Sequence, residues 1–286
     1  MKILVTGLTG LVGSRVAELL STRHEFNNIS RSTGVDIENK KSVLSVISAS
    51  DAQVVLHLAA KTNVDGCETD KSLGQNGEAW KINVEGTRNI AGACSQTNKK
   101  LIYISTDFVF DGTKETYSEE DIPNPVNWYA KTKYEGEKIV QDLKTPWIIA
   151  RIAYPYRANF VRPDFFRAIL NRLKNNEPVS AVTDHVFTPT FIDDIAFALD
   201  ILIKSNSQGI FHVVGSQNLT PFAAANLIAG EFVLDKSKIS KTTRSDFFSN
   251  RATRPFQLSL KNDKITKLGI KMRTFDEGLR KIKTQI

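Results

Sequence analysis

Two side chains four residues apart, Tyr129 and Lys133, form a pair that could transfer a proton. If residues 127–141 form a helix, this spacing places the phenol and the ammonium on one face, one turn apart. A tyrosine pKa of about 10 makes a poor acid at neutral pH, but a nearby cation favours the phenolate and lowers that pKa. Such a tyrosine could protonate a carbonyl oxygen during a reduction, or deprotonate an alcohol during an oxidation. Thr106, which follows a buried strand expected over residues 101–104, would offer a hydroxyl to the same oxygen.

Tyr-x-x-x-Lys pairs are common on helices, so the pair gains weight only from its surroundings. The N-terminal residues predict the element that would supply a hydride donor. A short β-rich run, Lys2–Thr6, leads directly into Gly7-x-x-Gly10-x-x-Gly13, and a helix is expected after it. Gly7 permits the tight turn, Gly10 lets a pyrophosphate approach the backbone, and Gly13 lets the helix pack closely on the strand. The helix N-terminus would face the phosphates of a dinucleotide.

The second expected strand, Phe26–Ile29, ends in Ser30 and Arg31 rather than in an acidic residue. A carboxylate at this position usually binds the ribose 2′-hydroxyl of NADH. Arg31 could instead pair with the 2′-phosphate of NADPH, or it could be a surface loop residue, and the sequence leaves both readings open. Residues 34–37 are predicted to turn into a third extended segment, in which Asp36 could accept a hydrogen bond from the adenine amino group.

Strands alternate with helices up to about Val214, which predicts an α/β fold with a mostly parallel sheet covered on both faces. Small residues at the end of the strand 54–58 would let a cofactor ring lie close, and Gly86 indicates close packing inside a long helix. Helices and loops without further buried strands are expected from Gly215 onward. The further predicted strands span residues 54–58, 147–151 and 210–214. The predicted helices span residues 40–50, 78–96 and 160–174. Two more helices are predicted, one capped by Asp193 and one that begins with Thr220 and Pro221.

Composition narrows the class of protein. The chain has 286 residues, 41% of them hydrophobic and 24% charged, which is ordinary for a globular protein. No apolar run is long enough to span a bilayer, and the N-terminus lacks the features of a signal peptide. Cys67 and Cys94 have no metal-ligand spacing and are expected to be reduced thiols. We therefore expect a cytoplasmic protein with no membrane partner and no bound metal.

The formal net charge is +7, and the segment from Asp235 to the end is strongly basic. A basic segment can indicate nucleic-acid binding. It can also be a solvated lobe that steers an anionic nucleotide substrate. We prefer the second interpretation and expect no nucleic-acid partner, because the basic residues alternate with apolar ones at helical spacing and no nucleic-acid motif is present.

From Met1 to about Val214 the chain resembles the extended short-chain dehydrogenase/reductase superfamily, and within it the dTDP-4-dehydrorhamnose reductases. The superfamily motifs are Thr6-Gly-x-x-Gly-x-x-Gly13, Ala59-Ala60, Asn83-Val-x-Gly86-Thr and Tyr129-x-x-x-Lys133. The motifs typical of the reductases are Ser105-Thr-Asp-Phe-Val-Phe-Asp-Gly112, Val64-Asp65 with Cys67-Glu68, and Asp184-His-x-x-Thr-Pro-Thr190. Those enzymes reduce the 4-keto group of a nucleotide-linked deoxysugar.

This resemblance implies a role for each matched residue. Tyr129 becomes the proton donor, Lys133 its pKa shifter and a ribose ligand, and Thr106 the hydroxyl that polarises the carbonyl. Asp107, Phe108 and Tyr154 fall where the family contacts the sugar. The implied cofactor-binding residues are Gly7, Thr9, Gly10, Leu11, Val12, Gly13, Arg31, Asp36, Ile37, Leu58, Ala59, Ala60, Thr62, Asn83, Tyr129 and Lys133.

Several positions near the expected substrate depart from the family pattern. The family often has Tyr at the position of Phe108, Trp at that of Tyr154 and Gln at that of His185, and residues 71–79 are longer than usual. His185 could be a sugar contact or a satisfied loop histidine, and we favour the latter. Phe108 also follows Asp107 where the related 4,6-dehydratases carry Glu, which argues against a dehydratase.

Together these residues predict a Rossmann-type doubly wound sheet with a smaller C-terminal substrate lobe. Residues 1–153, joined by 190–214, would bind the cofactor, and residues 154–189 and 215–286 would form the lobe. The expected activity is NADPH-dependent reduction of a 4-keto nucleotide sugar, with NADH as the alternative cofactor and a homodimer as one assembly. A nucleotide-sugar epimerase, or a non-catalytic regulatory subunit resembling that of methionine adenosyltransferase, are the alternative functions.

Overall fold

A computed structural model describes residues 1–286 and contains a central six-stranded sheet in which every neighbouring pair is parallel. The strands, in spatial order, are β2 (Glu25–Ile29), β1 (Lys2–Thr6), β3 (Val54–His57), β4 (Lys100–Thr106), β5 (Trp147–Ile152) and β9 (Gly209–His212). Successive side chains on a strand point to opposite faces. Val54 and Leu56 accordingly pack on one side of the sheet and Val55 on the other, so both faces are buried.

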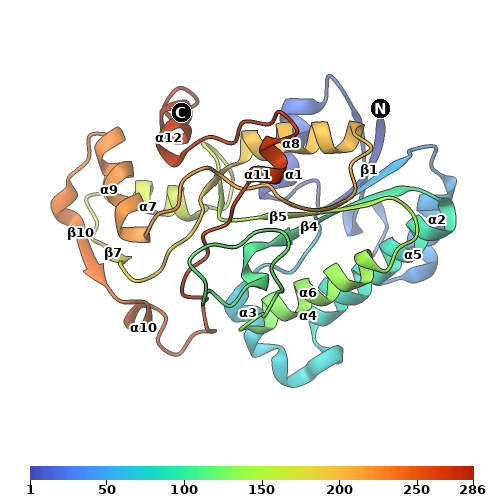
Figure 1. Cartoon of the computed structure of the whole chain (residues 1–286), viewed down its shortest axis with the longest axis horizontal. Helices are drawn as coiled ribbons and strands as arrows, with labels where there is room; N and C mark the ends of the chain where they lie inside the picture. Colours follow the sequence, from blue (N-terminus) through green and yellow to red (C-terminus); the bar gives the residue numbers. More distant parts are fainter.

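Helices cover both faces of this sheet (Figure 1). One face is covered by α1 (Leu11–Leu20), α8 (Ile192–Lys204) and α11 (Asp263–Thr266), and the other by α2 (Lys40–Ala49), α5 (Thr87–Thr97) and α6 (Trp128–Gln141). The predicted Rossmann-type α/β fold is therefore confirmed. None of the helices combines the length and the apolar composition needed to cross a membrane.

A smaller lobe lies to one side of the sheet, at the left of Figure 1. It contains α7 (Phe165–Lys174), α9 (Pro221–Glu231), α10 (Arg244–Phe247) and α12 (Phe275–Lys283), with the strand pairs β7 (Val179–Val182)–β10 (Ile239–Thr242) and β6 (Pro155–Tyr156)–β8 (Thr190–Phe191). Its core is aromatic, and it brings Tyr156 and Phe165 against Phe275 from the distant C-terminal helix. Ile265 and Ile270 pack instead in the core of the main sheet, so part of the C-terminal segment returns to that sheet.

The cofactor side of the chain differs from the sequence predictions in two places. Residues 34–37 do not form an extended strand; the chain makes the short helix η1 (Arg31–Thr33) and then turns at Gly34, whose φ is 81°. The long helix predicted over 78–96 is divided into α4 (Glu78–Trp80), a π-helical turn η3 (Lys81–Gly86) and α5. A Cβ on Gly86 would lie 2.7 Å from Cδ1 of Ile37, which confirms the predicted close packing.

Helix starts and short strands account for the other differences. The helix predicted from Phe160 begins at Phe165, after the capping residue Asp164. Asp193 does not cap α8, which begins at Ile192; its carboxylate instead pairs with Arg15. The strand pairs β6–β8 and β7–β10 were not predicted. The remaining short helices are α3 (Val64–Thr69), η2 (Lys71–Asn76), η4 (Asp107–Val109) and η5 (Lys236–Lys238).

Candidate active site

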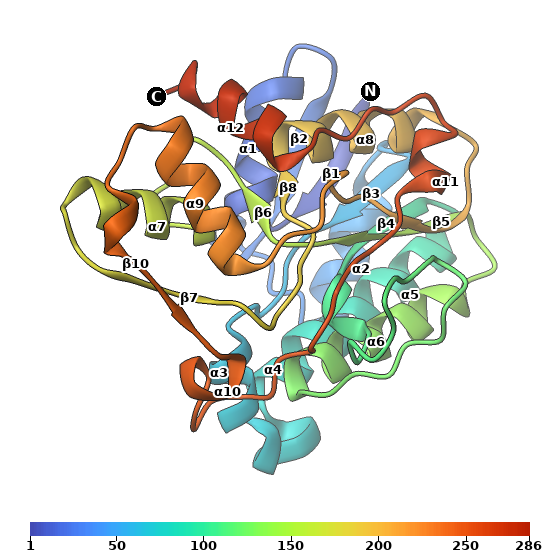
Figure 2. The same cartoon turned by 60° about the vertical axis from the view of Figure 1, so that its left-hand side comes forward.

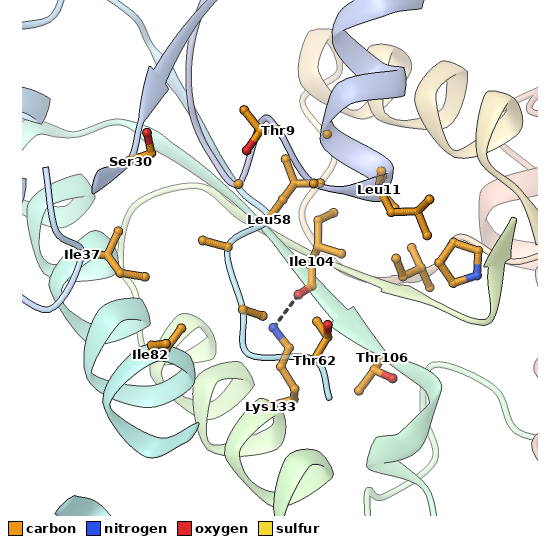
Figure 3. Close-up of a pocket in the computed structure, with 18 of the residues that line it drawn as sticks. Thr9, Leu11, Ser30, Ile37, Leu58, Thr62, Ile82, Ile104, Thr106 and Lys133 are labelled. Carbon is orange, nitrogen blue, oxygen red and sulfur yellow. Dashed lines mark hydrogen bonds between the residues drawn. The ribbon is translucent and has the colours of Figure 1, made fainter. Parts of the chain in front are cut away.

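A cavity of about 620 Å³ lies at the C-terminal ends of the parallel strands, where open α/β sheets bind ligands. Eighteen of its lining residues appear in Figure 3. Of the residues named from the sequence, the cavity is lined by Gly7, Thr9, Gly10, Leu11, Val12, Gly13, Arg31, Asp36, Ile37, Leu58, Ala59, Ala60, Thr62, Thr106, Asp107, Tyr129, Lys133 and Tyr154. One cavity thus brings the expected nucleotide-binding turn together with the expected proton-transfer residues.

The glycine turn leaves room that a side chain would fill. Gly7 has a φ of 73°, and a Cβ there would lie 2.7 Å from the backbone nitrogen of Ala59. A Cβ on Gly13 would collide with the carbonyl oxygen of Gly7. Helix α1 begins after Gly10, and no side chain caps it. The amides of its first turn are therefore available to bind an anionic group, as a dinucleotide pyrophosphate requires.

Helix α6 positions the Tyr129 and Lys133 side chains. Asn127 caps the helix by accepting a hydrogen bond from the Ala130 amide, and the Glu68 carboxylate accepts one from the Trp128 amide at 2.7 Å. Lys133 reaches from the helix to the end of β4, where its Nζ donates to the carbonyl oxygen of Ile104 at 2.8 Å (Figure 3). The start of α6 and its Lys133 side chain are therefore both tied to neighbouring elements.

The protonation of the pair differs from the sequence expectation. Lys133 was expected to lower the pKa of Tyr129, but burial raises that pKa, and the Thr106 hydroxyl only partly opposes the rise. Burial also lowers the pKa of Lys133 to about 7. Lys133 is therefore only partly charged at neutral pH, which weakens its effect on the phenol. A protonated Tyr129 suits a group that donates its proton during a reduction.

Thr106 and Asp107 form a second polar group in the cavity. The Thr106 hydroxyl donates to Oδ1 of Asp107 at 3.0 Å and accepts from the Phe108 amide at 3.2 Å. Asp107 is only 2% exposed, and its Oδ2 has no hydrogen-bond partner. Burial raises the pKa of this carboxyl to about 7. Asp107 therefore has an oxygen available for a ligand, in line with its expected position near the sugar.

Arg31 lies where the adenosine end of a cofactor is expected. Its side chain is 65% exposed, and it pairs with Asp36 at 2.9 Å and with Glu38 at 2.7 Å. The hydroxyls of Ser30 and Ser32 are 2.8 Å apart on either side of it, and both residues line the cavity. The arginine and two hydroxyls form a group of donors that could hold a phosphate.

Two residues expected to contact ligands do not line the cavity. Asn83 is buried; its side chain bonds to the backbone of Lys61 and to the Thr132 hydroxyl, and so joins the π-helical turn to α6. Phe108 is buried against the rings of Tyr129 and Tyr154, where it supports these two side chains. His185 is also buried and outside the cavity lining, and it hydrogen-bonds to Tyr154.

Sequence reasoning missed ten residues that line the cavity. Half of them lie in the last residues of a strand of the parallel sheet or directly after it, so a systematic reading of strand ends would have found that half. They are Ile29, Ser30, Ser32, Val35, Ile82, Ile104, Ser105, Ile152, Pro155 and Arg162.

An ionic cluster, which we call the arginine clasp (Asp65, Arg251 and Arg254), joins α3 to the segment after α10. The Asp65 carboxylate accepts from Arg254 at 2.6 Å, from Arg251 at 2.7 Å and from the Ala252 amide at 3.1 Å. Figure 2 shows this segment passing close to α3. Asn127, the cap of α6, also donates to the Thr253 carbonyl. The clasp therefore fastens the C-terminal segment beside the start of α6.

Replacing Asp65 with asparagine is expected to destabilise the fold by about 2 kcal/mol, because the largely buried Arg254 loses its charged partner. The two arginines and the Ala252 amide hold the pKa of Asp65 well below its usual range. This contribution is therefore complete above a pH of about 4 and is lost as the pH falls further. Urea unfolding at pH 7 and pH 3 measures it, with Asp51→Asn, on an exposed pair, as the control. An equal loss of stability at both pH values would contradict the assignment.

Comparison with known proteins shows which proteins this chain is similar to. The family model described as the RmlD substrate binding domain matches residues 1–286. The chain is 30% identical to dTDP-4-dehydrorhamnose reductase from Aggregatibacter actinomycetemcomitans, over 99% of this chain and 98% of the relative. It is also 30% identical to methionine adenosyltransferase 2 subunit beta from Bos taurus, over 96% of this chain and 84% of the relative.

A solved structure also matches this chain over its whole length. The crystal structure of dTDP-4-dehydrorhamnose reductase from Bacillus anthracis in complex with NADP superposes with a TM-score of 0.91 and is 27% identical in sequence. The match covers 100% of this chain and 99% of the other. The similarity thus extends through the C-terminal lobe as well as the nucleotide-binding sheet.

Proposed function

The chain belongs to the RmlD substrate binding domain family, and from this membership we propose that it is an NADPH-dependent reductase of a 4-keto nucleotide sugar. Several similar proteins are dTDP-4-dehydrorhamnose reductases, so we propose dTDP-4-dehydrorhamnose first as the substrate. One observation carries the proposal. The glycine turn, Thr106, Tyr129 and Lys133 line a single cavity at the strand ends.

The residues of this cavity suit a nicotinamide dinucleotide, since the turn at Gly7 and Gly13 has the space that a pyrophosphate needs. The turn and α1 would hold the diphosphate, Ala59, Ala60 and Thr62 would lie along the cofactor, and Lys133 would bind the ribose. A bound NADPH supplies the hydride for the reduction. The chain itself positions the cofactor and the substrate and surrounds them with fixed dipoles.

The proton comes from Tyr129 in this mechanism. The phenol is protonated in the free chain, because burial raises its pKa, and it would give its proton to the oxygen of the keto group as the carbon is reduced. The Thr106 hydroxyl would turn from Asp107 to the same oxygen and stabilise the negative charge that develops there. Lys133 in its charged form would favour the resulting phenolate.

Arg31 supports NADPH as the cofactor. Replacing it with alanine is expected to raise the KM for NADPH about tenfold while leaving the KM for NADH within about twofold, because only NADPH carries the 2′-phosphate. Steady-state kinetics with each cofactor measure the change. Arg88→Ala, on an exposed pair outside the cavity, is the matched control. Equal changes for the two cofactors would mean that Arg31 is only a surface residue.

The activity is tested by mixing the purified chain with dTDP-4-dehydro-6-deoxy-L-mannose and following the loss of NADPH and NADH absorbance separately. Steady consumption that depends on the sugar nucleotide supports the reductase. Cofactor that stays bound without net consumption would favour an epimerase instead.

A second candidate function rests on the similarity to methionine adenosyltransferase 2 subunit beta. This chain would then bind a partner enzyme and retain the cofactor cavity without catalysis. Co-purification with a methionine adenosyltransferase, together with no turnover of any 4-keto nucleotide sugar, would favour it. The presence of Thr106, Tyr129 and Lys133 in one cavity favours the reductase.

We propose that residues 154–189 and 215–286 form the substrate-binding lobe, apart from the stretch around Ile265 and Ile270 that packs on the main sheet, and that residues 1–153 with 190–214 hold the cofactor. Asp107 of the cofactor part would also contact the sugar. The basic charge of the C-terminal part would attract the substrate diphosphate. That the protein is cytoplasmic and that it forms a homodimer are still predictions from the sequence.

A further inference from the structure

Tyr154 has an unusual backbone and a fixed side chain. Its φ is 39°, in the left-handed region that residues with a side chain seldom adopt, and Pro155 follows it. Such backbone strain persists only where the surroundings enforce it, and it is frequent at functional sites. The ring packs against Phe187 with centroids 4.5 Å apart and against Phe108 at 6.1 Å. The residue lines the cavity next to the proposed reaction site.

His185 determines the direction of the hydrogen bond that the Tyr154 hydroxyl makes. Its Nδ1 lies 3.0 Å from the carbonyl oxygen of Pro255 and 3.2 Å from that of Phe256. Carbonyl oxygens only accept hydrogen bonds, so Nδ1 must carry the ring proton. Burial lowers the pKa of His185, so the ring is neutral near pH 7 and its Nε2 is an acceptor.

The Tyr154 oxygen lies 3.0 Å from this Nε2. Because Nε2 has no proton to give, the tyrosine hydroxyl must donate. A tyrosine has a single hydroxyl proton, so the Tyr154 oxygen can offer only an acceptor to a ligand. Asp107 also lines this cavity, and its buried Oδ2 has no partner. The sugar end of the cavity therefore contains one oxygen, that of Tyr154, which can only accept a hydrogen bond from a ligand.

We propose that His185, acting through Tyr154, makes this end of the cavity selective for a sugar hydroxyl, which donates its hydrogen bond to the Tyr154 oxygen. His185 is a positioning residue in this scheme, and Tyr154 makes the contact. The inference rests on the proposed function and adds what distinguishes one 4-keto sugar from another at this site. A sugar that carries hydrogen or an O-methyl group in place of that hydroxyl would leave the acceptor unpaired and bind more weakly.

A double-mutant cycle tests the inference, with the KM for dTDP-4-dehydro-6-deoxy-L-mannose measured at saturating NADPH. Tyr154→Phe is expected to raise this KM about tenfold, the value of one lost hydrogen bond, while kcat falls less. His185→Leu is expected to raise it about threefold to tenfold, because the tyrosine proton is then free to turn toward the ligand. Adding His185→Leu to Tyr154→Phe is expected to change KM no further, since the histidine acts only through the tyrosine hydroxyl.

His185→Gln is the conservative variant, because one amide can donate to a carbonyl and accept from the tyrosine. It is expected to keep KM close to that of the unaltered chain. Tyr134→Phe, on α6 but outside the cavity lining, controls for the loss of a hydroxyl. Urea unfolding of each variant separates a change in binding from a change in folding.

If the two substitutions each raised KM independently, so that their factors multiplied in the double variant, the inference would be overturned while the proposed function stands. The same follows if Tyr154→Phe folds normally and its KM is unchanged. No turnover of the sugar by the unaltered chain would overturn the proposed function, and with it the substrate on which the inference rests.

Discussion

Replacing Tyr129 with phenylalanine is expected to lower kcat about a thousandfold, within the range that a positioned acid or base contributes. Phenylalanine keeps the ring that packs edge-on against Phe108 and removes only the proton that the keto oxygen needs. The affinity for NADPH is expected to change little, because in the proposed mode most contacts to the cofactor come from the glycine turn and the strand ends.

Single-turnover kinetics with saturating NADPH and dTDP-4-dehydro-6-deoxy-L-mannose measure this loss, and fluorescence titration measures cofactor affinity. Tyr134→Phe, five residues along the same helix, is the matched control and should react at the normal rate. A Tyr129→Phe chain that turned over normally would show that the proton comes from elsewhere.

Replacing Lys133 with methionine is expected to move activity and stability in opposite directions. Activity should fall about a hundredfold, because the charge that favours the phenolate and the contact with the ribose are both lost. The fold should become more stable at pH 7, on the order of 2 kcal/mol, because burial of the ammonium costs more than its hydrogen bond to Ile104 returns.

The pH dependence of this gain has a definite sign. The pKa of Lys133 falls from 10.5 to about 7 on folding. Between these values the unfolded chain binds more protons than the folded chain, so this group makes the unaltered protein more stable as the pH rises. The stability gained by Lys133→Met should therefore be largest below pH 7 and shrink toward pH 10.

Urea unfolding across this pH range, combined with steady-state kinetics, measures both effects. Lys131→Met is the control, because its ammonium is half-exposed and pairs with Glu135 on the surface. A Lys133→Met chain that was less stable than the unaltered one at pH 7 would contradict the assigned burial cost.

Local patterns predicted the parts of the site that local sequence determines. The strand, glycine turn and helix at residues 2–20 are formed by neighbours in the chain, and the spacing of Tyr129 and Lys133 fixes their common helical face. The end of β3 is similarly clear, because the small residues Ala59 and Ala60 come shortly after its buried residues. The cavity lining therefore contains most of the residues named from these motifs.

Contacts between distant segments could not be read in the same way. The pairing of β7 with β10 joins residues about sixty positions apart, and neither strand has a strong pattern of its own. The hydrogen bonds of His185 to Pro255 and of Asp65 to Arg254 join loops that meet only in the folded chain. The protonation of Tyr129 also depended on burial, which spacing along one helix does not reveal.

The most direct test of the central claim follows the hydride itself. The chain would be given NADPH carrying deuterium on both positions of the nicotinamide C4, together with dTDP-4-dehydro-6-deoxy-L-mannose, and the sugar product examined by mass spectrometry and NMR. We predict one deuterium atom in each product molecule, at C4 of the sugar, with one NADPH consumed for each. A product without deuterium, or no product from a chain that binds both ligands, would contradict the assignment as a reductase of this substrate.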